Sequence, residues 1–504
     1  MGEKSQLKYG AILSYGMVLF NIVCGLLYTP WMIRQIGKSD YGLYILVSTF
    51  LHYFVVDFGI WMAVNKILSR LRAEGREDEE KNVIGLTTKL YLCLDAVVCI
   101  AVIIAYFFID NLFDNLQAEE LSRFKIAYII AAIFSVLSFP FGFLKGIFQS
   151  HEYFIQTKIF DFAVKIGIIL LTIILLLLNK GLYALVIAYG LVPFIVNISR
   201  VVYLRDKGVR VNIHYHSKTL LKDIFSSSMW LFVIVLAEMV INNISPSLLA
   251  AFSNTTEIAI FGIGLTLYQY LHTFSSSING LFLPKVVKLQ VHNDNEGLHR
   301  LTYKIGRLQL IITGFVALGI ILTGPDFIEA WLGPDFSKSY LVAAFLVIPQ
   351  LLINMQQIEN TQLFTIGKIK YKTLAMALTA ASTIVLSVVL IPRLGALGSG
   401  VAITVSNFLF MVVLMNFYYH KHLGFTPIQY VMELKSLIIG FSVVAGVCVV
   451  INHFITPMMD IGWLSFIIKG CIYAVLYGVM LLFAMNDFEK GLILKPIINC
   501  FKRR

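Results

Sequence analysis

A carboxylate lies inside a long apolar stretch of this sequence, where a charged group is costly and usually has a function. It is Asp57, within VVDFGIWMAVNK at residues 55–66. Asp57 belongs to a set of residues spaced by four, which would form one stripe on a continuous helix: Tyr53, Asp57, Trp61 and Asn65. Such an aromatic and polar face suits carbohydrate binding. The same acid would alternatively pair with a lysine of a neighbouring helix, or bind a coupling proton or sodium ion.

Basic residues lie within or beside other apolar stretches. Asp161 and Lys165 stand at i and i+4 with the acid first, the favourable order for a helical ion pair. Lys165 is alternatively the deepest cation available to an anionic ligand. Lys89 and Lys145, near the ends of their stretches, either extend to the membrane surface or receive a phosphate. Arg34 either anchors a helix at the interface or binds phosphate with two hydrogen bonds.

Two further acids and one polar cluster complete the candidate residues. Asp95 and Glu238 lie near the centres of apolar stretches, and Tyr268, Gln269 and His272 lie together in another. They either serve helix packing or line a binding wall or an ion site. The candidates for a coupling proton or sodium ion are Asp57, Asp95, Asp161 and Glu238. We expect no metal and no cofactor, because the sequence contains no Cys/His ligand spacing and no nucleotide-binding motif.

Membrane-spanning helices must position these residues. The 504-residue chain is 58% hydrophobic and 14% charged, with a mean hydropathy of +0.80, unlike a soluble domain. A spanning helix needs roughly 20 apolar residues, and such stretches recur along the whole chain. The sequence predicts an all-α polytopic membrane protein with about fourteen spans: 10–33, 41–64, 83–109, 125–149, 154–178, 181–203, 224–250, 257–283, 305–324, 339–361, 369–391, 396–418, 431–455 and 462–484. The tenth is the weakest, because amides and Glu359 crowd its second half.

The distribution of lysine and arginine predicts the orientation. With the N-terminus in the cytoplasm, most of the 40 basic residues fall in segments on the cytoplasmic side. Both termini are therefore expected to be cytoplasmic. This bias accounts for the net charge of +11, so we expect no nucleic-acid partner.

A weak internal repeat predicts the domain organisation. LLNKGLYALVIAY and LIPRLGALGSGVAIT both place a basic residue, a glycine and Ala-Leu at an outside turn, with Gly181 and Gly395 at equivalent positions. Two six-helix lobes would follow, with a substrate path between them. An appended helix pair with few polar residues would pack outside this core. The expected parts are an N-lobe at 1–203, a linker at 204–223, a C-lobe at 224–418, the appended pair at 419–484 and a basic tail at 485–504.

Six phrases occur in an order that resembles a known family. They are IRQIGKSDYGLY, VVDFGIWMAVNKILSRLRAEG, LFLPKVVKLQ, FIEAWLGPDFSKSY, QLFTIGKIKYKT and LIPRLGALGSGVAITVSNF. Together they resemble the polysaccharide-export branch of the multidrug/oligosaccharidyl-lipid/polysaccharide exporter superfamily, which includes O-antigen and capsule repeat-unit flippases. The resemblance implies a V of two six-helix bundles that moves undecaprenyl-pyrophosphate-linked oligosaccharides to the outer leaflet of a bacterial plasma membrane, without ATP and without enzymatic chemistry. Implied partners are the lipid-linked oligosaccharide, membrane lipids, a polysaccharide polymerase and chain-length machinery.

The candidate residues match what such a cargo requires. Cations would bind the pyrophosphate, and aromatic and amide groups would bind sugars. The cavity candidates are Arg34, Tyr53, Asp57, Trp61, Asn65, Lys89, Lys145, Lys165, Tyr268, Gln269 and His272. Two other functions stay open on the sequence: an ion-coupled exporter of drugs or metabolites, and a non-transporting scaffold of a polysaccharide assembly complex.

Overall fold

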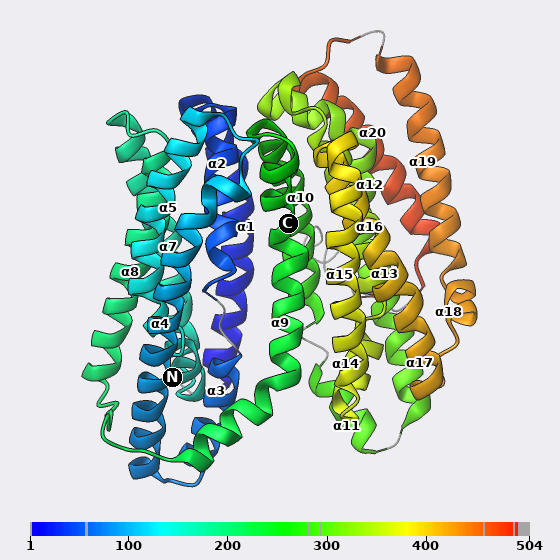
Figure 1. The fold of residues 1–504 in the computed structure, drawn as a ribbon. Coiled ribbons are helices and arrows are strands. Elements are labelled where there is room, and N and C mark those ends of the chain that lie inside the picture. Colours follow the sequence, from blue (N-terminus) through cyan, green and yellow to red (C-terminus); the bar gives the residue numbers. More distant parts are fainter. Residues whose placement is uncertain are drawn as a thin grey trace, which may run out of the picture. The chain divides into compact units, whose positions relative to one another are not determined.

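The computed structural model describes residues 3–55, 59–279, 283–292, 294–456, 459–486 and 489–491. Every secondary-structure element within these residues is helical (Figure 1). The predicted all-α polytopic class is thereby confirmed. The chain divides into two compact units, the first formed by Met1–Ala259 with Ile391–Gly395 and the second by Ile260–Leu390 with Ala396–Arg504.

Within its described residues, the first unit contains nine α-helices, one short 3-10 helix, the first turn of α10 and the segment Ile391–Gly395. They are α1 (Glu3–Ile36), α2 (Lys38–His52), α3 (Ile60–Ala73), α4 (Glu77–Leu112), α5 (Ala118–Ser138), η1 (Phe139–Phe141), α6 (Leu144–Ser150), α7 (Phe154–Leu177), α8 (Leu182–Asp206), α9 (Lys218–Phe252) and α10 (Thr255–Asn279). The division differs from the expected lobes, because α9 packs against α2 and α3 and so joins this unit. The two six-helix lobes stay a prediction.

The second unit begins within α10 and contains the remaining helices. They are α11 (Leu283–Val291), α12 (Asn295–Leu332), η2 (Pro334–Phe336), α13 (Ser339–Met355), α14 (Gln357–Thr365), α15 (Ile369–Leu394), α16 (Ala396–Ser406), the π-helix η3 (Asn407–Leu414), α17 (Met415–Leu423), α18 (Pro427–Glu433), α19 (Lys435–Ile455) and α20 (Trp463–Ala484). The α19–α20 pair packs against α12, as Figure 1 shows.

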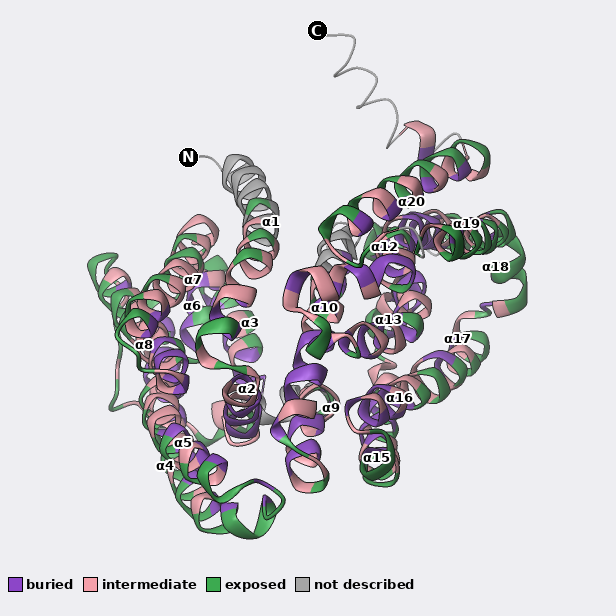
Figure 2. Cartoon of the chain, turned by 90° about the horizontal axis from the view of Figure 1, so that it is seen from above, coloured by how far each residue is buried: buried purple, intermediate pink, exposed green. Residues whose placement is uncertain are grey.

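Apolar side chains remain exposed along many of these helices. Figure 2 shows exposed residues along much of α4, α19 and α20, and they include Phe107 and Phe483, which are 72% and 87% exposed. Apolar surface of this extent is expected where helices contact lipid rather than water. Within the described residues, eleven helices are long and apolar enough to cross a membrane. The protein is a multi-pass membrane protein, and the count of fourteen spans stays a prediction.

The expected continuous span 41–64 is wrong, because the helix is broken between α2 and α3. Gly59 precedes α3 with φ +70°, in the left-handed region that glycine adopts without strain. The four-residue spacing from Tyr53 to Asn65 therefore describes no single stripe. Asp57 lies outside the described residues.

Two other expected spans are also interrupted. The span 125–149 is divided by the 3-10 turn at Pro140, whose ring and missing N–H end α5. The span 339–361 is divided at Gln356 into α13 and α14. In both places, therefore, a single predicted span comprises more than one helical element.

Gly181 and Gly395 occupy matching corners, as their spacing in the sequence predicts. Both have φ in the left-handed region, at +52° and +55°. A β-carbon on Gly181 would lie 3.9 Å from Asp40 Oδ2, and one on Gly395 would lie 2.5 Å from Glu257 Oε2. Each glycine thus faces an acid from the first turn of another helix, α2 or α10. This shared arrangement supports the internal repeat.

Candidate functional site

The helices α3 and α6 cross closely and bring four polar or aromatic side chains together. Gly146 makes the crossing feasible, because a β-carbon there would lie 2.5 Å from the Trp61 carbonyl oxygen. Trp61 and Asn65 come from α3, and Lys145 and Gln149 come from α6. We call these four residues the α3–α6 group. Each helix contributes residues spaced by four, which lie on one helical face.

Lys145 presents its charge without a carboxylate partner among the described residues. Its Nζ lies 4.3 Å from the centre of the Trp61 ring, and its side chain is exposed. Asn65 Nδ2 donates to Gln149 Oε1 at 3.1 Å, which fixes the two amides beside this cation. A cation, an aromatic face and oriented amides are groups that bind anionic sugar conjugates. Three members were predicted from the sequence. Gln149 was missed, although it follows Lys145 by four residues.

Tyr53 has a packing role in the structure. Its hydroxyl donates to the carbonyl oxygen of Asn243 and lies 3.2 Å from Ser247 Oγ. Both partners belong to α9. Tyr53 therefore connects the end of α2 to α9, and the break before α3 separates it from the α3–α6 group.

The predicted ion pair between Asp161 and Lys165 is not formed. Asp161 pairs instead with Arg200 of α8, at 2.7 Å, because α7 and α8 pack together and bring the guanidinium within reach. Lys165 is half-buried and forms no hydrogen bond or ion pair within the described part of the chain. Within the described residues, Lys165 is thus a cation without a salt-bridge partner in the middle of α7, one turn after Asp161. It shows no contact between Lys165 and the α3–α6 group.

Lys89 holds the segment that precedes α9. Its Nζ lies 3.4 Å from the Tyr215 carbonyl oxygen and 3.3 Å from His216 Nδ1. Nearby, a β-carbon on Gly85 would lie 1.9 Å from the Asn212 carbonyl oxygen, so the segment lies directly on α4. These contacts place Lys89 apart from the α3–α6 group and give it a structural role.

The other predicted residues of the first unit are scattered. Arg34 is exposed in the last turn of α1. Asp95 has a buried oxygen, Oδ1, with no hydrogen-bond partner among the described residues. Glu238 is exposed on α9, and Asn242, one turn later, donates to the Glu238 carbonyl oxygen at 2.9 Å. No contact joins these residues into one site.

The predicted polar cluster lies in the second unit. Tyr268 donates to Gln350 Oε1 at 3.1 Å, and Gln350 Nε2 donates to Asn354 Oδ1 at 2.8 Å. Gln269 and His272 are exposed on α10. Tyr268 thus begins a row of amides along α13, whereas Glu238 belongs to the other unit.

The first unit also forms a partly open cavity, lined by aromatic residues, that the sequence did not indicate. Its volume is about 250 Å³, and its lining includes Tyr91, Ser135, Ser138, Tyr189 and Pro193. The Ser138 hydroxyl is buried and has no partner among the described residues. A cavity with this lining has room and polar groups for a small ligand or water.

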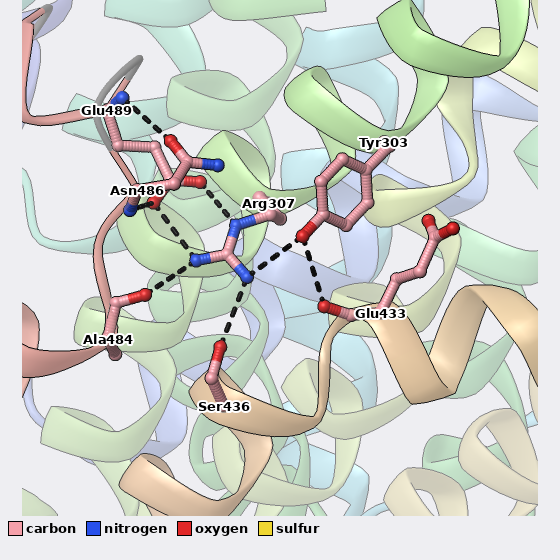
Figure 3. Close-up of polar contacts among 7 residues, drawn as sticks. All are labelled: Tyr303, Arg307, Glu433, Ser436, Ala484, Asn486 and Glu489. Atoms are coloured by element: carbon pink, nitrogen blue, oxygen red, sulfur yellow. Dashed lines mark hydrogen bonds and ion pairs between the residues drawn. The ribbon is translucent and has the colours of Figure 1, made fainter.

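Arg307 of α12 is a buried cation that is fully paired (Figure 3). Arg307 and Glu489 are 2% and 0% exposed, and they form two charged hydrogen bonds, one of them 3.0 Å from Nη2 to Oε2. Arg307 Nη2 also donates to the Ala484 carbonyl oxygen at 2.7 Å, at the end of α20. Asn486 and Glu489 exchange backbone-to-side-chain hydrogen bonds of 2.9 and 3.0 Å, as in a capping box. The expected basic tail thus begins with a buried anchor, Glu489.

A second buried pair joins α12 to α20. Lys469 and Asp326 are each 4% exposed, and Lys469 Nζ lies 2.8 and 2.9 Å from the two carboxylate oxygens. Ser465 also donates to Asp326, at 2.6 Å. At 1.5 Å per residue, Arg307 and Asp326 are about 28 Å apart along α12, close to the thickness of a bilayer core. The appended pair is therefore fastened to α12 near both ends.

Comparisons with known proteins agree with this architecture. A family model described as polysaccharide biosynthesis protein matches residues 7–290. An uncharacterized membrane protein of Methanocaldococcus jannaschii is 21% identical over 483 residues, covering 92% of this chain and 93% of that protein.

Two solved structures share the fold. The lipid II flippase MurJ, in an inward closed conformation, has a TM-score of 0.64 at 16% identity and covers 95% of this chain and 98% of its own. An inward-facing multidrug resistance MATE family transporter has a TM-score of 0.64 at 13% identity and covers 82% of this chain and 98% of its own. The chain belongs to the polysaccharide biosynthesis protein family, and it has the fold of the multidrug/oligosaccharidyl-lipid/polysaccharide exporter superfamily.

Proposed function

We propose that this protein is a flippase for lipid-linked oligosaccharides in cell-surface polysaccharide biosynthesis. It moves undecaprenyl-pyrophosphate-linked repeat units from the inner to the outer leaflet of a bacterial plasma membrane, by alternating access of its two halves. Both termini lie in the cytoplasm, and a proton or sodium gradient drives the movement. The family of the chain and the fold that it shares with transporters support this proposal.

The α3–α6 group is the observation that carries the proposal. Lys145 offers an exposed ammonium group that no described carboxylate neutralises, at 4.3 Å from the centre of an indole ring. A pyrophosphate would bind the ammonium, and the first sugars would stack on Trp61 or accept hydrogen bonds from the amides. Lys165, half-buried on α7, would hold the pyrophosphate deeper in the membrane.

The test measures movement of a labelled undecaprenyl-pyrophosphate oligosaccharide across proteoliposomes containing the purified protein. We expect wild type to flip the lipid and Lys145→Ala to flip it more slowly. Lys66→Ala is the matched control, because Lys66 is an exposed lysine of α3 outside the α3–α6 group. Equal rates in Lys145→Ala and Lys66→Ala would remove the α3–α6 group from the site.

Two outcomes would overturn the proposed cargo. No flipping of cargo taken from the native host, together with drug sensitivity and intact surface sugars after gene deletion, would indicate an exporter of drugs or metabolites. Unchanged polysaccharide synthesis after simultaneous neutralisation of Asp57, Lys165 and Glu238 would indicate a scaffold.

A further inference from the structure

Glu359 is a buried acid for which the fold provides no counter-charge. It lies on α14, three residues after the break at Gln356, and is 1% exposed. Both carboxylate oxygens are buried and have no hydrogen-bond partner in the described part of the chain. This contrasts with Glu489 and Asp326 of the same unit, each of which is bonded to a buried cation.

An apolar cluster surrounds this carboxyl group. Met355 and Leu363, one turn before and one turn after Glu359, both belong to it, and so do Tyr419 and Tyr430. Both tyrosines lie close enough to Glu359 to interact with it electrostatically. The Tyr430 hydroxyl is itself engaged, because it donates to the Met355 carbonyl oxygen at 2.8 Å.

Charged groups on the helices packed against α14 are exposed or paired with other residues. α11, α12, α13 and α17 pack against it. The α11 lysines, Lys285 and Lys288, are exposed, and Arg307 of α12 is paired with Glu489. α13 carries no charged residue.

On α17, the ring of His420 contacts the Phe425 carbonyl oxygen and that of His422 contacts Lys368, while Lys421 is exposed. Within the described residues, no cation lies within ion-pair distance of Glu359.

The neighbouring amides are bonded to other groups as well. Gln356 and Asn416 exchange hydrogen bonds of 2.8 and 3.2 Å, and Gln362 donates to Thr302 at 3.4 Å. An ionised carboxylate in this setting would be costly, since no cation among the described residues compensates for its lost hydration. A metal ion would need several further oxygen ligands, whereas a proton needs only the carboxylate.

We infer that Glu359 is a proton-binding site of the second unit. In the conformation described here, its carboxyl group holds a proton. When α14 separates from α17, the O–H bond breaks, the proton passes to water and a carboxylate remains. The carboxylate then requires hydration. Glu359 is therefore ionised only while α14 and α17 are apart, and protonated while they are packed together.

The site lies where the helices are already irregular. The break between α13 and α14 precedes Glu359, and the π-helix η3 leads into α17 on the other side of the contact. The bonds between Gln356 and Asn416 join these two irregular segments. π-Helices and broken helices frequently accompany functional movements. Proton release would therefore favour a rearrangement at this place in the fold.

Infrared difference spectroscopy of the full-length protein in lipid nanodiscs tests proton binding directly, without any cargo. On raising the pH, we expect wild type to lose the C=O band of a protonated carboxyl group. Glu359→Gln should lack this change. Glu433→Gln is the control and should retain it, because Glu433 is exposed on the neighbouring α18. The same band change in wild type and Glu359→Gln would overturn the inference.

Thermal unfolding provides a second readout on the same samples. Glutamine resembles a protonated glutamate in size and charge, so Glu359→Gln should fold. We expect the melting temperature of wild type to fall more on raising the pH than that of Glu359→Gln. An equal fall in both proteins would contradict a buried protonated carboxyl group.

Coupling of this proton to cargo movement rests on the proposed function. In the flipping assay, we expect an imposed proton gradient to accelerate wild type severalfold and to leave Glu359→Gln unaffected. Equal acceleration of both would remove Glu359 from coupling while the flippase proposal stands. No flipping by either protein, with the infrared band assigned to Glu359, would reject the flippase proposal and retain the proton site.

Discussion

Arg307 of α12 and Lys145 of α6 are both cations on helices of mainly apolar sequence, yet their surroundings are opposite. Arg307 is buried and bonded to Glu489, Ser436 and the end of α20. Lys145 is exposed, and its ammonium group lies over the face of Trp61. Lys469 resembles Arg307, whereas Lys165 resembles Lys145 in having no salt bridge to any carboxylate that the structure describes.

This difference separates cations that hold the fold together from cations that are available to a ligand. A buried ion pair contributes strongly only while both members are present, because either one alone leaves a charge without compensation. An unpaired cation at a surface or cavity keeps its electrostatic attraction for an anion. Changes at the paired cations Arg307 and Lys469 should therefore alter stability, and changes at Lys145 and Lys165 should alter transport.

The largest expected effect is that of removing the partner of Arg307. Glu489→Leu leaves a buried guanidinium that cannot lose its proton, so the free energy of unfolding should fall by about 3–5 kcal/mol. Thermal unfolding of the purified protein measures this change. The double variant Arg307→Met/Glu489→Leu should recover most of the loss. A stable Glu489→Leu protein would show that the tail anchor contributes little.

A smaller loss of stability is expected at the other end of α12. Lys469→Met leaves Asp326 buried, but Ser465 still donates to it and the carboxyl group can take up a proton. We expect a loss of about 1–3 kcal/mol in the same assay. A loss as large as that in Glu489→Leu would mean that the two pairs fasten α20 equally.

Transport should depend on the unpaired cations rather than on the buried ion pairs. Lys165→Ala is expected to slow flipping roughly tenfold or more, since hydrogen bonds to charged groups contribute about 1.5–3 kcal/mol. Lys145→Ala should slow it less, because water can replace an exposed cation. Lys158→Ala, nearer the start of α7, is the control. Equal activity of the Lys165 and Lys145 variants at matched expression would remove Lys165 from the site.

The smallest expected effect concerns the aromatic face. Trp61→Leu removes the cation–π contact with Lys145, which at exposed sites contributes about 0.5–1 kcal/mol. Flipping should slow roughly two- to fivefold, with unchanged melting temperature. A large loss of stability would instead identify Trp61 as a packing residue of the α3–α6 crossing.

Part of the candidate site follows from the sequence alone. Trp61 and Asn65 share one face of α3 because their spacing of four matches the helical period. Tyr53 does not join them, since Gly59 ends that regularity. Lys165 was correctly placed among the apolar residues of its span. The alternative in which Lys165 pairs with Asp161 is not realised, because Asp161 forms its ion pair with Arg200 of the adjacent helix.

Length and apolar composition determined the helical membrane architecture, because a chain in lipid must satisfy its backbone hydrogen bonds within its own helices. The glycines at 181 and 395 likewise marked their corners, since a left-handed backbone favours glycine. Which charges meet was decided only by the tertiary structure. Glu489 reaches Arg307, and Glu359 meets no cation among the residues that the structure describes, because packing brings together or separates side chains that are distant along the chain.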